Sequence, residues 1–263
     1  MGLDARVRCR CWEAGLCTPP PYADHISFDA EDDDLYFDLP WEAHQAEWLA
    51  FEQWKAACCA HPGMDQAVEW ISNWSGIRSL QHALHELGED RFAHLLAEIP
   101  DLNGGLTSPA AAQSCLDELD VFEAAGAFGR QVVLVDRATG ARVNERVDAY
   151  DGNFFMAGST GHDFMLTADG FFEIRQDKAG LLFRSADFHQ RQGGDGQFAF
   201  RDTASDAACL CPHGVHHAEL GSYPDRLSVI VKGDDAGRYQ DMVDALRTVF
   251  AASVETGNPV AWL

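Results

Sequence analysis

The residues best suited to chemistry lie close together near the end of the chain. Cys209, Cys211, His213 and His216 occur within the run CLCPHGVHH. Thiolate sulfur and imidazole nitrogen are ligands that zinc prefers, and a cysteine beside a histidine can also become a nucleophile. The C-x-C spacing differs from the C-x2-C of common structural zinc sites, however, and no second pair follows it. Ordinary loop and core roles are therefore expected, with no cofactor. A zinc-binding protein or a Cys/His-dependent enzyme using residues 209–217 is the alternative.

Other cysteines could add ligands if the first strand lay beside this run, namely Cys9, Cys11 and Cys17. Cys9 and Cys11 fall on the apolar face of a predicted strand, a position that buried thiols fill without any metal. Cys58 and Cys59 are adjacent within a helical pattern, so they too are expected to behave as small apolar groups rather than as a disulfide.

No catalytic signature is complete elsewhere in the chain. His82, His85 and Glu86 lie in H-A-L-H-E, which lacks the order of the zinc-protease motif H-E-x-x-H. Neither the nucleophile elbow G-x-S-x-G nor a phosphate-binding glycine loop is present. The acidic run at 29–34 has Asp34 where an EF-hand loop needs glycine, so calcium is not expected. The sequence therefore predicts a protein that is not an enzyme.

Periodicity predicts the elements that would position these residues. Residues 3–12 alternate between apolar and polar, as a half-buried strand does, and Gly15 with the prolines at 19–21 ends the strand. A short strand at 35–39 precedes a long helix from 40 to about 61. Further helices are predicted at 64–74, 77–87, 89–98 and 109–125, the last with Ser108 as its N-cap.

Strand periodicity replaces helical periodicity after Gly129. Strands are predicted at 131–135, 142–147, 154–156, 163–167, 171–175 and 181–184, and a flexible loop at 190–197. A strand at 227–232 leads into a helix that starts at Asp234 or Asp235 and ends near 253. The predicted fold class is α+β: an N-terminal strand, a helical segment, then an antiparallel sheet with a C-terminal strand–helix unit.

A chain of 263 residues can form one large domain or two smaller ones. One integrated domain over residues 1–263 is preferred, because the first strand is expected to need a partner in the later sheet. A subdivision near Gly126 is the alternative, with an acidic, mainly helical part at 1–126 and a mainly β part with the closing helix at 127–263.

Negative charge is concentrated in the front half. The formal net charge is −23, and residues 1–125 contribute 23 acidic and 6 basic side chains, a net −17. Between Cys11 and Trp54 there is no Lys or Arg, and 11 carboxylates are interleaved with nine aromatic residues. Nucleic acids and anionic membranes are not expected partners, because phosphate contacts need a basic surface. A basic protein is the natural complement: charge would steer the encounter and aromatic rings would anchor the complex.

The acidic loop and the strand after it form the predicted partner-binding edge. Its residues are Asp29, Glu31, Asp32, Asp33, Asp34, Tyr36 and Phe37. On a strand, Tyr36 and Phe37 point to opposite faces, so one of the two rings is expected to be exposed among the acids.

The opening of the chain bears on location and family. MGLDARVRCRCW has charges where a signal peptide has an apolar core, and no apolar run has the length of a membrane span, so a cytoplasmic location is expected. Residues 1–21, with this strand, Gly15 and the triple proline, resemble the start of bacterial immunity proteins of polymorphic or contact-delivered toxin systems. The resemblance covers about the first 25 residues.

This resemblance implies a cytoplasmic antitoxin that blocks a cognate basic toxin, such as a nuclease or a deaminase, by tight binding. It assigns no functional residue, because such families bind their toxins through divergent surfaces. Neither the resemblance nor the rest of the sequence sets an oligomeric state.

Overall fold

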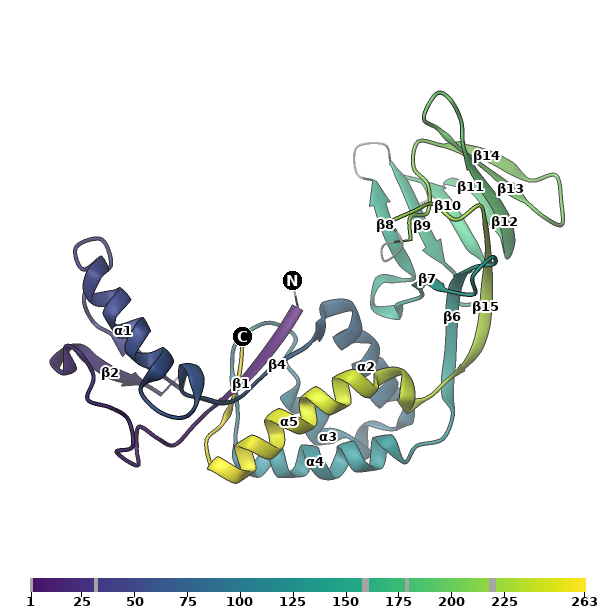
Figure 1. Cartoon of the computed structure of the whole chain (residues 1–263). Helices are drawn as coiled ribbons and strands as arrows, with labels where there is room; N and C mark the ends of the chain where they lie inside the picture. The colour runs from purple at the N-terminus through teal and green to yellow at the C-terminus, as the bar shows by residue number, and fades with distance from the viewer. Residues whose placement is uncertain (1, 31–32, 158–160, 178–179, 218–220) are drawn as a thin grey trace. The chain divides into compact units, whose positions relative to one another are not determined.

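The computed structural model describes residues 2–30, 33–157, 161–177, 180–217 and 221–263. The fold class is α+β, as predicted. The chain forms two compact units: the first comprises Met1–Gly126 and Ala236–Leu263, and the second comprises Ala127–Asp235 (Figure 1). The first boundary falls at the predicted subdivision, but the closing helix belongs to the first unit instead of the β-rich part. A single integrated domain stays a prediction.

A four-stranded antiparallel sheet runs through the first unit. Its order is β4 (Asp65–Asn73), β1 (Gly2–Arg8), β16 (Val260–Trp262) and β5 (Leu106–Thr107). Leu3, Ala5 and Val7 are buried on one face of β1, as the period-two pattern predicts. The first strand therefore finds its partners within this unit, and the expectation that it pairs with the later sheet is wrong.

Strand β4 stands where the sequence predicts a helix at 64–74. Its residues pair with β1 in antiparallel register, with Val68 opposite Arg6. Val68, Trp70 and Ile71 are β-branched or aromatic residues, which suit a strand once a partner strand is available. The tertiary pairing with β1 thus outweighs the local helical periodicity.

The helices are α1 (Gln45–Ala57), α2 (Trp74–Leu87), α3 (Ala93–Glu98), α4 (Pro109–Glu123) and α5 (Gln240–Thr256). Short 3₁₀ turns occupy Ala23–His25, Pro62–Met64, Glu89–Arg91 and Ala236–Tyr239. The Ser108 hydroxyl accepts a hydrogen bond from the Ala111 N–H at 3.2 Å, so the predicted N-cap of α4 is confirmed. Helix α5 packs against α4 and against β4, and the three lie together in Figure 1.

Residues 9–64 of the first unit contain a hydrophobic core of their own, and we call this segment the N-terminal lobe. It holds the hairpin of β2 (Ile26–Asp29) and β3 (Asp34–Phe37) together with α1. Phe37 stacks on Phe51 at 5.2 Å between ring centroids. Cys9, Cys11 and Cys58 are buried in the same core, as predicted.

The second unit consists of two antiparallel sheets. The six-stranded sheet has the order β14 (Ala208–Cys211), β13 (Phe198–Asp202), β12 (Asp187–Gln192), β15 (Arg226–Asp234), β6 (Phe128–Asp136) and β7 (Arg142–Glu145). The four-stranded sheet has the order β11 (Gly180–Ser185), β10 (Phe172–Gln176), β9 (His162–Leu166) and β8 (Asn153–Ala157), and a 3₁₀ turn lies at Asp148–Tyr150. Phenylalanine rings fill the core, with Phe172 stacked on Phe188 at 4.5 Å.

Part of the loop predicted at 190–197 is strand. Residues 190–192 end β12, and the chain then turns, with the Gly193 N–H donating to the Gln197 carbonyl at 2.7 Å. Phe188 and Gln190 are both buried on one side of β12. The alternation of buried and exposed residues therefore continues into the polar residues at the start of the predicted loop. Among the described residues, no helix combines the length and the apolar character that crossing a lipid bilayer requires.

Candidate functional site

Strand β14 places the two cysteines of the C-terminal run in the core of the second unit. Cys209 and Cys211 are two residues apart and lie opposite Phe200 and Phe198 of β13. Cys211 is fully buried, and Cys209 packs against the same aromatic cluster. Burial raises the pKa of the Cys209 thiol to about 12 and also raises that of Cys211, on which a backbone hydrogen bond at His213 acts in the opposite direction. Both groups are therefore thiols at neutral pH, which is the unreactive form.

The histidines of this run pack against aromatic rings. His213 lies 5.2 Å from Phe155 and His216 lies 5.0 Å from Tyr223, measured between ring centroids. In the described part of the chain, the ligand atoms of Cys209, Cys211, His213 and His216 do not gather into a group that could hold a metal ion. The alternative of a zinc site at these four residues is therefore not supported, because β14 places its cysteines in the core and the two histidines pack against other rings.

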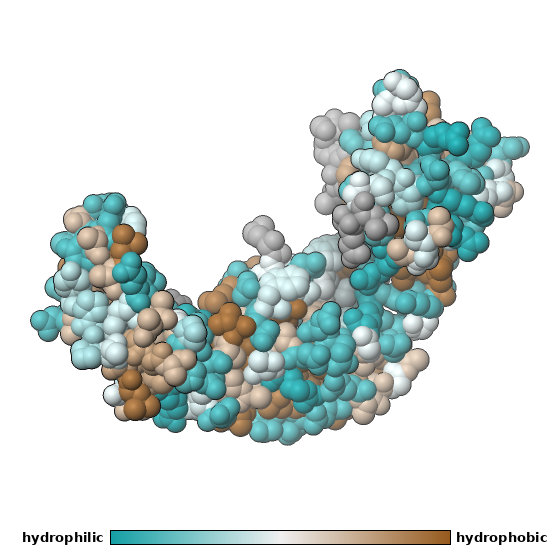
Figure 2. All heavy atoms as spheres, viewed as in Figure 1, coloured by the Kyte–Doolittle hydropathy of each residue, from teal (hydrophilic) through white to brown (hydrophobic). Residues whose placement is uncertain are grey.

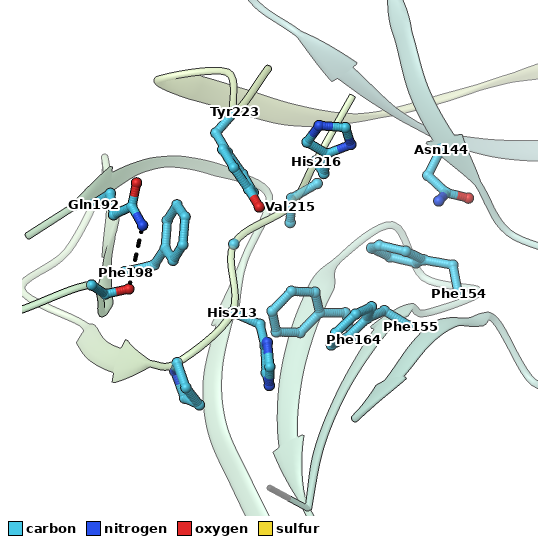
Figure 3. Close-up of a pocket in the computed structure, with 13 residues that line it drawn as sticks. Asn144, Phe154, Phe155, Phe164, Gln192, Phe198, His213, Val215, His216 and Tyr223 are labelled. Carbon is cyan, nitrogen blue, oxygen red and sulfur yellow. Dashed lines mark hydrogen bonds between the residues drawn. The ribbon is translucent and has the colours of Figure 1, made fainter. Parts of the chain in front are cut away.

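His213 and His216 instead line a pocket of about 320 Å³ in the second unit. Figure 3 shows Phe155 and Phe164 beside His213, with Tyr223 and His216 at another side of the pocket. The volume lies near the lower end of the range for ligand pockets, and aromatic and polar side chains both line the pocket.

Two acids of the predicted binding edge, Asp33 and Asp34, pair with basic residues of the same chain. Arg8 donates from Nε to the Asp33 carbonyl at 3.2 Å and from Nη2 to Asp33 Oδ1 at 3.3 Å. Asp34 pairs with Arg6 at 2.8 Å and with Lys55 at 2.6 Å. Asp33 is buried, and burial raises its pKa although Arg8 partly offsets this. These two acids therefore tie the N-terminal lobe to β1 and, through Lys55, to α1, and they do not form a free anionic surface.

The remaining residues of that edge are divided between core and surface. Phe37 is 0% exposed, whereas Tyr36 is 53% exposed. Tyr36 is therefore the one of the two rings that is exposed, as the strand alternation predicts. Including Phe37 in the contact surface is thus wrong, because the alternation of β3 turns its ring into the core. Asp29 is half-buried opposite Asp34 in the hairpin, and Glu31 and Asp32 lie outside the described residues.

A different set of exposed acids and rings lies on the N-terminal lobe. We define it as the aromatic–acid patch: Tyr36, Asp38, Trp41 and Glu42. Tyr36 and Trp41 each meet Trp48 edge-on at 6.2 Å, and the Trp48 indole N–H donates to the Leu39 carbonyl at 2.6 Å. Both exposed rings are therefore held in place by a ring that is itself anchored. Figure 2 shows hydrophobic and hydrophilic residues interspersed over the visible face of the molecule.

Asp34→Asn is expected to destabilise the first unit by about 2 kcal/mol at pH 7, because two charge-assisted contacts to partly buried cations are lost. Burial opposes ionisation of Asp34, but Lys55 and then Arg6 hold its pKa below the ordinary value. A depressed carboxyl pKa contributes stability above the unfolded-state value of about 4, and that stability is lost as the pH falls through the folded-state pKa. Urea unfolding should show the gap between wild type and variant closing below about pH 4. Asp38→Asn, at an exposed acid, is the matched control, and equal losses in both variants would contradict the role given to Asp34.

A second group of metal-type ligands lies in the N-terminal lobe. The ligand atoms of Cys9, Cys11, Cys59 and His61 all lie within 4.8 Å of one another, so these residues could hold a metal ion. Cys9 Sγ is 3.8 Å from Cys59 Sγ, and Cys11 Sγ is 3.3 Å from His61 Nδ1. Cys17 lies next to this group, with its Sγ 3.5 Å from that of Cys58.

The protonation of these thiols is uneven. Burial raises the pKa of Cys9 to about 12. Burial also opposes ionisation of Cys59, but the backbone N–H of His61, which donates to Cys59 Sγ at 3.4 Å, and the neighbouring thiols lower its pKa. Cys59 therefore loses its proton more readily than an ordinary thiol, and a bound cation would displace the protons of the thiols that ligate it.

The sequence predicts apolar roles for Cys9, Cys11 and Cys59, names Cys9 and Cys11 as ligands only for the 209–217 run, and predicts no role for His61, so the group was missed. Its signal is present as two ligand pairs of the same spacing, Cys9-Arg10-Cys11 and Cys59-Ala60-His61, separated by 50 residues. The second pair was missed because the sequence predicts a helix as far as residue 61. In the structure α1 ends at Ala57, and Cys59 and His61 lie in the loop after it.

No protein-family model, no curated protein and no solved structure matches this chain. The similarity of residues 1–21 to immunity proteins therefore stays a prediction, and the function has to be argued from the chain itself.

Proposed function

We propose that this protein binds and neutralises a basic protein partner, in the manner of an immunity protein that blocks a toxin. The first unit carries 26 acidic and 8 basic side chains, a formal net charge of −18. Five of those bases, Arg6, Arg8, Lys55, Arg78 and Arg247, are already in ion pairs within the unit. The excess of negative charge steers a cationic partner toward this unit and repels nucleic acids.

The observation that carries this proposal is the aromatic–acid patch. Tyr36 is 53% and Trp41 is 49% exposed, and both rest on Trp48. Exposed rings on a rigid support lose little conformational freedom on binding, and tyrosine and tryptophan are typical interface anchors. Asp38 and Glu42 are exposed in the same segment, so the patch suits a surface of arginine and lysine, whose cations bind both carboxylates and ring faces.

The direct test uses the product of the neighbouring reading frame, if that frame encodes a secreted protein with a small basic domain. Calorimetry of this domain with the wild-type chain is expected to show tight binding, and the Tyr36→Ala/Trp41→Ala variant is expected to weaken it by about 100-fold or more. Tyr150→Ala removes an equally exposed ring from the second unit and serves as the control. Absence of binding by the wild type contradicts the proposed function, and unchanged binding by the double variant contradicts the patch.

Charge should act mainly on the rate of association. Asp38→Asn/Glu42→Gln is expected to slow association and to flatten its dependence on salt, because carboxylates at the rim act through long-range steering. Asp241→Asn/Glu255→Gln removes two exposed acids of α5 and is the matched control. An association rate that falls equally in both variants would assign the steering to the net charge of the unit and not to the patch.

The alternative of a zinc protein or enzyme built on residues 209–217 has less support. Burial keeps Cys209 and Cys211 in the thiol form, and His213 packs on Phe155. A nucleophilic cysteine needs a lowered pKa and an exposed sulfur.

A further inference from the structure

We infer that Cys9, Cys11, Cys59 and His61 bind one zinc ion in a closed site that holds the N-terminal lobe in its fold. This inference is independent of the proposed function, because it concerns the folding of the lobe and needs no partner.

Two separations between ligand atoms are close to those of a tetrahedral metal site, and all four atoms lie within 4.8 Å of one another. With zinc–sulfur bonds of about 2.3 Å, two sulfur ligands on a tetrahedron lie about 3.8 Å apart, and a sulfur and a nitrogen lie slightly closer. Cys9 Sγ and Cys59 Sγ are 3.8 Å apart, and Cys11 Sγ is 3.3 Å from His61 Nδ1. A disulfide would need about 2.05 Å between sulfurs, so the geometry is that of separate ligands around a centre.

The type of the four donors selects the metal. Three thiols and one imidazole form the Cys₃His set of structural zinc sites, and no carboxylate or carbonyl belongs to the set. Calcium and magnesium require oxygen ligands and do not fit this group. Soft sulfur donors in a tetrahedral arrangement point to zinc among the common divalent ions.

Hydrogen bonds of the folded lobe hold the two ligand segments beside each other. Cys9 follows the last residue of β1, and its N–H donates to the Met64 carbonyl at 2.7 Å, which ties the two ligand segments together. The His61 N–H donates to Cys59 Sγ, an outer-shell bond of the kind that orients ligands and stabilises a thiolate. The folded lobe therefore presents all four ligands together.

The burial of the ligands indicates a structural site. Cys9 is 0% and Cys11 is 8% exposed, and Cys59 and His61 are half-buried. Four protein donors complete a tetrahedral shell and leave no position for a reacting water, unlike the three-ligand sites of zinc enzymes.

The position of the site in the chain explains what the ion would do. It joins two segments separated by 50 residues, and the loop it closes contains β2, β3 and α1. The core of this lobe is small, and cores of that size are usually reinforced by disulfides or a metal. A zinc ion here would supply a cross-link in a chain whose eight cysteines form no disulfide.

The test is elemental analysis of the full-length protein purified under reducing conditions. About one equivalent of zinc per chain is expected, falling below about a tenth of an equivalent in Cys59→Ser. Cys209→Ser is the matched control and should keep the zinc, because its thiol lies in the other unit. A zinc-free wild type that nevertheless folds would overturn the inference, and so would loss of zinc from Cys209→Ser with retention in Cys59→Ser.

Cobalt(II) absorption reports on the metal site in the wild-type protein, so this test does not require Cys59→Ser to fold. Wild-type protein loaded with cobalt is expected to show the absorption of tetrahedral cobalt with sulfur charge-transfer bands. His61→Cys keeps four ligands and should strengthen those bands by adding a thiolate, whereas Cys17→Ser should leave them unchanged. Loss of the bands in Cys17→Ser with no change in His61→Cys would show that the ion sits at Cys17, Cys58 and Cys59 instead, and would overturn the ligand set.

Discussion

Removal of the metal from the wild-type protein is expected to unfold the N-terminal lobe and to leave the second unit folded. Closing a loop of about 50 residues contributes about 4 kcal/mol in the chain-entropy description of a cross-link. The free energy of zinc binding is also free energy of folding wherever the site is absent from the unfolded chain. A strong chelator should therefore shift the fluorescence of Trp12, Trp48 and Trp54, all of which belong to the core of the lobe.

Hydrogen exchange can locate this effect. Amides of α1 should lose protection after chelation, while amides of β10, in the aromatic core of the second unit, should keep theirs. Returning zinc should restore the protection, and magnesium at the same concentration should not, since the site offers no oxygen ligands. Full protection of α1 in protein shown to be metal-free would mean that the aromatic core alone holds the lobe.

The sequence predicted those parts of the fold that depend on neighbouring residues. Ser108 before Pro109 is a complete helix start, and the structure places the N-cap of α4 there. The turn at 136–140 joins two strands within a dozen residues, and β6 and β7 pair across it. In both cases the residues that determine the local structure lie within a few positions of the helix start or turn that they form.

Pairings between distant segments could not be read in the same way. Strand β4 has a helix-like pattern, and only its pairing with β1 makes it a strand. Strand β16 reaches β1 from the other end of the chain, with Val260 opposite Val7. A single sequence does not reveal which of several apolar segments will pair over such separations, because the deciding contacts form only in the folded chain.

The candidate sites failed for the same reason. Asp33 and Asp34 look like a free acidic loop until β1 brings Arg8 and Arg6 beside them. Cys9 and Cys59 look like two core thiols until the loop between them closes. The acidic composition and the wealth of thiols were visible in the sequence, but which acids remain exposed and which thiols meet are properties of the tertiary fold.

Phe37→Ala is expected to destabilise the N-terminal lobe by about 4 kcal/mol, the usual cost of removing a fully buried phenylalanine ring. Phe37 stacks on Phe51 at 5.2 Å and meets Trp48 edge-on at 5.3 Å. Its loss opens a cavity beside Trp48, the ring that supports the aromatic–acid patch. Urea unfolding followed by tryptophan fluorescence measures this loss directly.

Tyr36→Ala is the matched control, because it removes a ring of similar size from the adjacent position of the same strand. Tyr36 is half exposed, so the change in unfolding free energy should stay below about 1 kcal/mol. The two variants separate stability from recognition. Phe37→Ala should weaken partner binding only to the extent that the lobe unfolds, and Tyr36→Ala should weaken it while the lobe stays folded. If the Phe37→Ala protein were as stable as the Tyr36→Ala protein, the burial of Phe37 would be contradicted. Phe37 would then belong to the exposed partner-binding edge that the sequence predicts.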